Sequence, residues 1–133
     1  MMAADFNEPY ADGEPRATVL IVEDEVLIRM LLSEALRSAG FEVIEAADAD
    51  EALAVLHTSP CPDTLITDVK MPGLVDGLGL AQIVRRTQPQ LKVIVTSGHA
   101  AADAATEIAD AFVRKPYDLG GLVRQVRALT APR

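Results

Sequence analysis

The sequence has no tryptophan and only one cysteine. Cys61 is the only cysteine, so the fold cannot depend on an internal disulfide. The chain also lacks a secretory signal pattern and any run of about 18 apolar residues, the length that a membrane-spanning helix requires. We therefore expect a cytoplasmic protein that does not insert into a membrane.

Basic side chains are fewer than acidic ones, and aromatic side chains are few. The 133 residues include 12 Lys and Arg against 20 Asp and Glu, a formal net charge of −8, and only three Phe and two Tyr. Binding to nucleic acid needs clustered Lys and Arg to neutralise phosphates, so no direct contact with nucleic acid is expected. Half of the residues are hydrophobic and most of these are aliphatic, which favours one domain with helices packed on an aliphatic sheet.

Short apolar runs alternate with helical patterns from Thr18 onward. Residues 1–16 show no apolar period and contain two prolines, so they are expected to form a flexible tail before a folded domain over 17–133. The patterns predict strands at 18–22, 41–45, 64–67, 92–96 and 111–114, and helices at about 26–39, 49–57, 77–87, 101–109 and from 119 onward.

This alternation predicts an α/β fold with a parallel sheet, right-handed crossovers and helices on both faces. We expect the flavodoxin-like, doubly wound arrangement of five strands in the order 2-1-3-4-5 with five helices. Ligands in such folds bind beyond the carboxyl ends of the strands. The residues that follow each strand are therefore the candidates for function.

Acidic side chains follow the first and third predicted strands. Glu23 and Asp24 come directly after the first strand, and Asp68 comes directly after the third. These strands are neighbours in the expected order, so the three carboxylates share one pocket and repel one another unless a cation lies among them. Hard oxygen ligands favour Mg²⁺ over zinc, which prefers His or Cys.

The fourth and fifth strands are followed by groups that suit an anion. Lys115 comes after the fifth strand, and a hydroxyl, from Thr96 or Ser97, stands at the end of the fourth. A cation site, an anion site and a central carboxylate together suggest phosphoryl transfer to Asp68.

Four motifs at these strand ends are similar to those of one known family. They are VEDE at 22–25, TDVKMPG at 67–73, TSG at 96–98 and KP at 115–116. In order and spacing they resemble the receiver domain of two-component response regulators, over about residues 17–130. The loop over 71–77 is one residue longer than the commonest form in the family.

The resemblance implies a role for each pocket residue. Asp68 would be the phosphoacceptor for a sensor histidine kinase or a histidine phosphotransfer protein. Asp24 would bind Mg²⁺ directly, Glu23 would act mainly through a water, and the backbone carbonyl of Lys70 would complete the protein ligands. Lys115 would pair with the phosphoryl oxygens.

The resemblance also implies a switch. Ser97 falls at the position of the family's switch hydroxyl, with Thr96 as the alternative, and Phe112 falls at that of its aromatic switch residue. Phosphorylation would draw Ser97 inward and let the Phe112 ring follow, which would alter the surface of the fourth helix, fifth strand and fifth helix. A core role is the alternative for Phe112.

The predicted function is a phosphoacceptor and switch that controls a downstream protein target or relays phosphate. It is not an enzyme beyond self-directed phosphotransfer and autodephosphorylation, and about three residues after the last helix suggest a stand-alone receiver. The start of the first helix, at Val26, Leu27, Arg29 and Met30, is the expected kinase dock. The alternatives are a Mg²⁺-dependent phosphatase of the haloacid dehalogenase type, which would need an aspartate where Lys70 stands, and a degenerate receiver that binds partners without phosphorylation.

Overall fold

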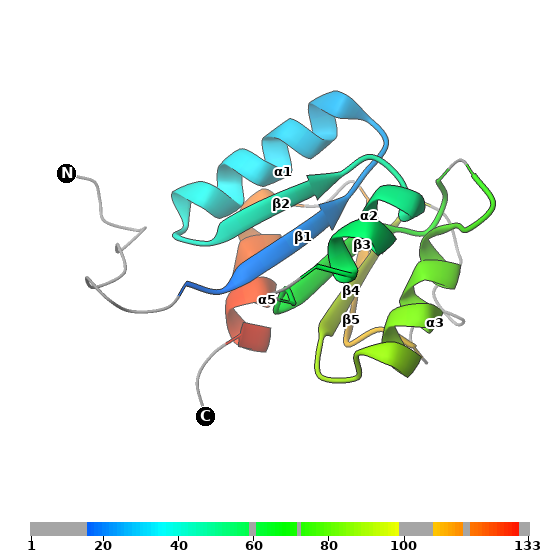
Figure 1. Cartoon of the computed structure of the whole chain (residues 1–133). Helices are drawn as coiled ribbons and strands as arrows, with labels where there is room; N and C mark the ends of the chain where they lie inside the picture. Colours follow the sequence, from blue (N-terminus) through cyan, green and yellow to red (C-terminus); the bar gives the residue numbers. More distant parts are fainter. Residues whose placement is uncertain (1–15, 59–60, 72, 99–107, 116–117, 131–133) are drawn as a thin grey trace.

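The computed structural model describes residues 16–58, 61–71, 73–98, 108–115 and 118–130. Its centre is a parallel sheet of five strands in the order β2-β1-β3-β4-β5, which confirms the predicted topology (Figure 1). The strands are β1 (Thr18–Val22), β2 (Glu42–Ala46), β3 (Thr64–Asp68), β4 (Lys92–Ser97) and β5 (Ala111–Arg114).

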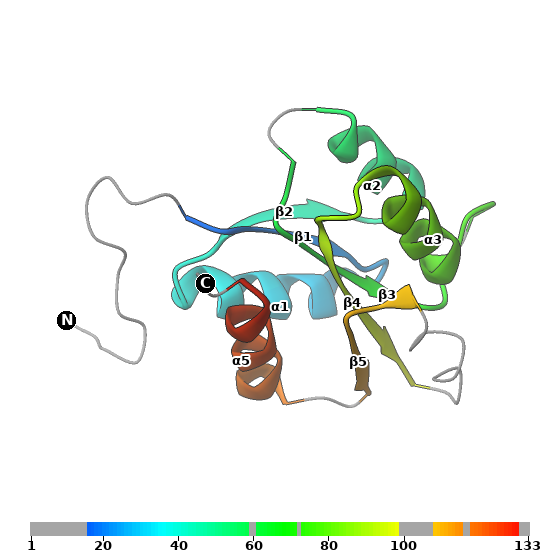
Figure 2. The same ribbon diagram turned by 90° about the horizontal axis from the view of Figure 1, so that it is seen from below.

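Helices cover both faces of this sheet, as Figure 2 shows. The helices α1 (Val26–Ser38) and α5 (Leu119–Thr130) lie on one face, and α2 (Ala49–Leu56) and α3 (Gly77–Thr87) lie on the other. The predicted helix over 101–109 falls outside the described residues except at Ile108 and Ala109, and the predicted tail does so except at Arg16.

The turn between α1 and β2 differs from the prediction by one residue. Phe41 was expected to begin the second strand, but its backbone N–H donates to Leu36 O at 3.1 Å and so caps α1. Gly40 allows this turn with a φ of 101°, in the left-handed region that favours glycine. The strand β2 therefore begins at Glu42.

The register of the central strands brings their carboxyl ends to one edge of the sheet. Val22 pairs with Thr67, Asp68 pairs with Thr96, and Ser97 pairs with Arg114. The polar residues that end β1, β3, β4 and β5 consequently lie at nearly the same height. The residues that precede them in these strands are mostly buried and aliphatic, so the polar residues are held in place by the packed core.

The loop between β3 and α3 returns tightly onto the end of β3. Gly77 N–H donates to Val69 O at 2.9 Å, and a Cβ on Gly77 would lie only 1.6 Å from Asp68 O. Asp76 caps the helix, since its side chain accepts from Gly79 N–H at 2.8 Å. The longer loop thus leaves the helix starting at Gly77, packed directly against the Asp68 backbone.

Candidate functional site

Three carboxylates converge at the carboxyl edge of the sheet. Glu23, Asp24 and Asp68 each offer an oxygen, and these oxygens all lie within 4.8 Å of one another. Glu23 is buried, Asp68 is half-buried and Asp24 is exposed, so the cluster opens to solvent on one side. The arrangement follows from the adjacency of β1 and β3 in the sheet.

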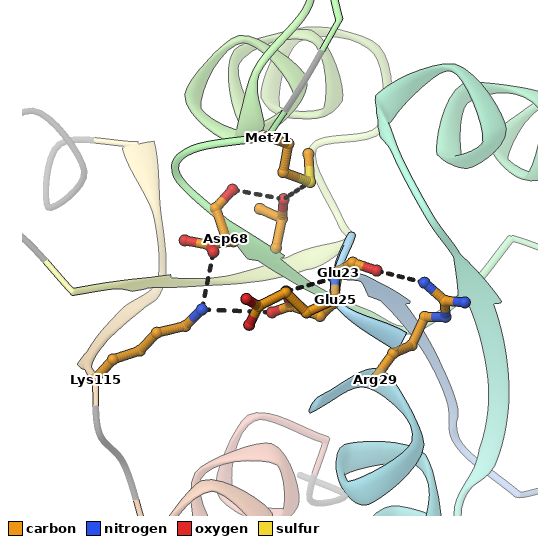
Figure 3. A network of polar contacts seen from close by, with 7 residues as sticks. Glu23, Glu25, Arg29, Asp68, Met71 and Lys115 are labelled. Atoms are coloured by element: carbon orange, nitrogen blue, oxygen red, sulfur yellow. Dashed lines mark hydrogen bonds and ion pairs between the residues drawn. The ribbon is translucent and has the colours of Figure 1, made fainter. Parts of the chain in front are cut away.

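Lys115 joins two of these carboxylates (Figure 3). Its Nζ donates to Asp68 Oδ2 at 2.8 Å and to Glu23 Oε1 at 3.5 Å. The Lys115 backbone N–H donates to Ser97 O at 2.8 Å, which anchors the lysine at the end of β5 beside β4. Lys115 and Asp68 are therefore held together by both the sheet and a charge-assisted hydrogen bond.

The site carries more negative charge than its lysine balances. Burial raises the pKa of Glu23 above its usual range, and the nearby Asp68 charge adds to this, whereas the Glu25 backbone N–H and Lys115 oppose it. Glu25 N–H donates to Glu23 Oε2 at 3.2 Å. Three carboxylates against one ammonium, with only oxygen donors, fit a hard divalent cation such as Mg²⁺.

The backbone of Asp68 is held from below. The Thr67 hydroxyl donates to Asp68 O at 3.1 Å and also contacts Met71 Sδ at 3.9 Å. Val69 N–H donates to Thr96 O at 2.9 Å, so the ladder extends past the end of β3. Lys70, whose backbone carbonyl is the remaining predicted metal ligand, follows with an exposed side chain.

The two candidate switch hydroxyls lie on opposite faces of β4. Val95 packs with α2 and α3, so Ser97, two residues later, continues that face, whereas Thr96 lies on the face covered by α1 and α5. Both residues are only 2% exposed. Phe112 is half-buried, pairs with Val95 and packs on the same cluster. Ser97 and Phe112 thus share one face of the sheet.

Two residues that contribute to the site were not predicted to do so. Gly77 fits only as glycine against the Asp68 carbonyl. Arg29 was expected on the exposed docking surface, but its side chain is 17% exposed and donates to Glu23 O at 2.6 Å. A hydrophobic pattern marks which side of a helix is apolar, but it does not show how far a guanidinium reaches.

Comparisons with known proteins agree with this geometry. Residues 19–127 match the family described as response regulator receiver domain. The probable transcriptional regulator ycf27 of Guillardia theta is 36% identical over 121 residues, which are 89% of this chain and 47% of that protein. The DNA-binding transcriptional regulator NtrC of Salmonella typhimurium is 36% identical over 115 residues, 84% of this chain and 24% of that protein. The chain therefore spans less than half the length of these relatives.

Solved structures agree as well. A putative response regulator from Chloroflexus aurantiacus has a TM-score of 0.80 and 34% identity, covering 89% of this chain and 100% of that one. Among the described residues, no helix is both long enough and apolar enough to cross a membrane. The stand-alone arrangement stays a prediction. The family match and the fold together show that the chain belongs to the receiver domains of two-component response regulators.

Proposed function

We propose that the protein accepts a phosphoryl group on Asp68 from a sensor histidine kinase or a histidine phosphotransfer protein in a Mg²⁺-dependent reaction. The observation that carries this proposal is the contact of 2.8 Å between Lys115 Nζ and Asp68 Oδ2, beside a cluster of three carboxylates. Membership of the family supports it, because receiver domains are signalling domains that bind Mg²⁺ at an acidic pocket. We assign the receiver domain to residues 17–133.

The transfer step needs a nucleophile and charge neutralisation. A carboxylate oxygen of Asp68 attacks the phosphorus of a phosphohistidine, and the P–O bond forms as the P–N bond breaks and the imidazole leaves with the electron pair. Lys115 already contacts Asp68 and is placed to follow the phosphoryl oxygens. Mg²⁺ would neutralise charge on those oxygens when bound, held by Asp24 and Asp68, by Glu23 through a water, and by the Lys70 carbonyl.

The acyl phosphate would be lost by self-directed hydrolysis. Asp24 is exposed, so water reaches the pocket. The alternative of a haloacid dehalogenase-type phosphatase needs a general acid two residues after the nucleophile, where Lys70 stands with an exposed side chain. The degenerate receiver that binds without phosphorylation is the second alternative, and the experiment below separates it.

The response would travel through Ser97 and Phe112. Both lie on the face of the sheet that packs with α2 and α3, and β5 lies at the edge of the sheet. A phosphoryl group on Asp68 would attract the Ser97 hydroxyl, and the Phe112 ring would fill the space that it leaves. A downstream protein that reads the surface of the fourth helix, β5 and α5 would sense the change; of this surface, the fourth helix falls mostly outside the described residues.

The partner that supplies the phosphoryl group would dock on the first half of α1. Four apolar side chains are exposed there beside the pocket, between 47% and 67% of their surface: Val26, Leu27, Met30 and Leu31. An apolar patch of this kind suits the histidine-bearing helix of a kinase or phosphotransfer protein. We infer that the protein would meet this partner in the cytoplasm, and that it would need neither direct contact with nucleic acid nor membrane insertion.

The test is phosphorylation by a small donor. The protein is incubated with acetyl phosphate and Mg²⁺, and its intact mass is compared with that of an Asp68→Asn variant and of a sample with EDTA. The parent should gain the mass of one phosphoryl group, and both controls should not. No gain in the parent, or an equal gain in the variant, refutes the assignment of Asp68.

A further inference from the structure

The side chain of Arg29 points away from solvent and toward the turn between β1 and α1. We call this turn, formed by Glu23, Asp24 and Glu25, the acidic turn. Its Nη1 donates to Glu23 O at 2.6 Å, and its Nε donates to Glu45 Oε1 at 3.3 Å. Figure 3 shows Arg29 on the opposite side of the Glu23 backbone from Lys115 and Asp68. The guanidinium thus joins a backbone carbonyl at the site to a carboxylate on β2.

The carbonyl that Arg29 binds belongs to the peptide between the two adjacent acidic residues. Glu23 N–H donates to Ala46 O at 3.1 Å, so β2 holds the other end of the same residue. Arg29 N–H donates to Glu25 O at 2.9 Å, which places the arginine on the first turn of α1, below the acidic turn. The orientation of the Glu23–Asp24 peptide is therefore set between β2 and Arg29.

We propose that Arg29 is a positioning residue for the divalent-cation site. By fixing this peptide it keeps the Glu23 and Asp24 carboxylates convergent, and so raises the affinity for Mg²⁺ without touching the ion. The inference rests on the proposed function, since it concerns the same acidic site.

The charge of Arg29 and its positioning role should have opposite effects on the affinity for Mg²⁺. A guanidinium close to a cation site repels the cation, so a role through charge alone would weaken Mg²⁺ binding. A hydrogen bond that orients the ligands strengthens binding, and loss of such an outer contact typically lowers metal affinity by about 10-fold or more. Removal of the side chain's charge and donors therefore separates the two roles by the sign of the change.

The experiment measures the dissociation constant for Mg²⁺ by titration of ¹⁵N-labelled protein, followed through backbone amide shifts. Arg29→Met removes the charge and both donors but keeps an apolar stem of similar length, and its dissociation constant should rise about tenfold. Arg29→Lys keeps the charge, but one ammonium cannot reproduce the forked contact, so its dissociation constant should also rise.

Arg37→Met is the matched control. Arg37 is on the same helix and contacts the other oxygen of Glu45, with Nη1 to Oε2 at 3.3 Å, but its side chain is 53% exposed. Its loss removes the same charge from α1 and should leave the dissociation constant within about twofold of the parent, because exposed charges are screened.

A second readout follows the acidic turn itself before Mg²⁺ is added. The Glu25 N–H that donates to Glu23 Oε2 should shift its resonance in Arg29→Met and keep it in Arg37→Met. Mg²⁺ binding in Arg29→Met as tight as in the parent, or tighter, overturns the inference while the proposed function stands. If Arg29→Met does not fold, Arg29→Lys decides, and an unchanged dissociation constant overturns the inference. A parent that binds no Mg²⁺ refutes the proposed function itself.

Discussion

The contact between Gly77 and Asp68 yields a test of how closely the phosphoacceptor backbone must be held. In a Gly77→Ala variant the new Cβ would lie 1.6 Å from Asp68 O and 2.6 Å from Asp68 C. Carbonyl oxygen and Cβ must then separate by about 1.4 Å to reach 3.0 Å, the lower limit of real contacts. Both atoms belong to backbone or are fixed to it, so either β3 or the start of α3 has to move.

The magnitude follows from two opposing effects. Overpacking of this kind typically lowers the free energy of unfolding by about 1–3 kcal/mol, whereas replacement of glycine by alanine in a helix raises it by about 0.5–1 kcal/mol. The variant should therefore lose up to about 2.5 kcal/mol of unfolding free energy. The effect on phosphorylation should be larger, because displacement of a reacting group by about 1 Å can cost about 100-fold in rate.

Two assays measure these effects separately. The chain has no tryptophan, so urea unfolding is followed by circular dichroism, and phosphorylation by acetyl phosphate is followed by intact mass. Gly120→Ala is the control, because its Cβ would meet only the end of the Arg124 side chain at 3.5 Å and the carboxylate of Asp118. This control should be at least as stable as the parent and equally reactive. A Gly77→Ala variant with the parent's stability and phosphorylation rate would refute the reasoning.

Three further predictions concern charge and the switch. Burial opposes ionisation of Asp110, yet hydrogen bonds from Arg85 and from a β4 backbone N–H lower its pKa overall. Ionised Asp110 therefore stabilises the fold at pH values above the usual pKa of a carboxyl group. This stabilisation is lost as the pH falls through the lowered pKa of Asp110. Asp110→Asn should lower the free energy of unfolding by about 1 kcal/mol in urea at pH 7, and this cost should shrink as the pH falls below the usual pKa of a carboxyl group; a cost that stays constant down the acid range would contradict the assignment. Lys115→Met removes the ammonium that competes for Asp68, so Mg²⁺ should bind about fivefold more tightly, the factor equivalent to about 1 kcal/mol, and weaker binding in the NMR titration would argue against this. Ser97→Ala should still be phosphorylated but lose the amide shifts of β5, whereas Thr96→Val should keep them, and the reverse result would assign the switch to Thr96.

The strands were predictable because buried, β-branched runs have a clear signature, but their ends were not. The predicted third and fourth strands stop at Thr67 and Thr96, where apolar residues give way to polar ones. The ladder continues to Asp68 and Ser97, because backbone pairing does not depend on side-chain polarity. The phosphoacceptor candidate is therefore part of the sheet rather than of the loop after it.

The members of the candidate site could be named from the sequence, whereas their supports could not. Charged residues at the carboxyl ends of β1, β3 and β5 identify Glu23, Asp68 and Lys115, because a parallel sheet brings these ends to one edge. The roles of Gly77 and Arg29 depend on how an element approaches another in three dimensions. A glycine at the start of a helix and an arginine on its first turn are too common in sequences to reveal such contacts.

The position of Lys115 has a mechanical consequence. It follows β5, which among the strands of the described residues pairs only with β4 and so lies at the edge of the sheet, whereas Asp68 belongs to the central strand β3. The Lys115–Asp68 contact thus acts as a brace that spans β4 and ties the outermost strand to the middle of the sheet. A phosphoryl group inserted between the two residues would lengthen this link without breaking it. The edge strand β5 would therefore shift relative to β3 but stay connected to it.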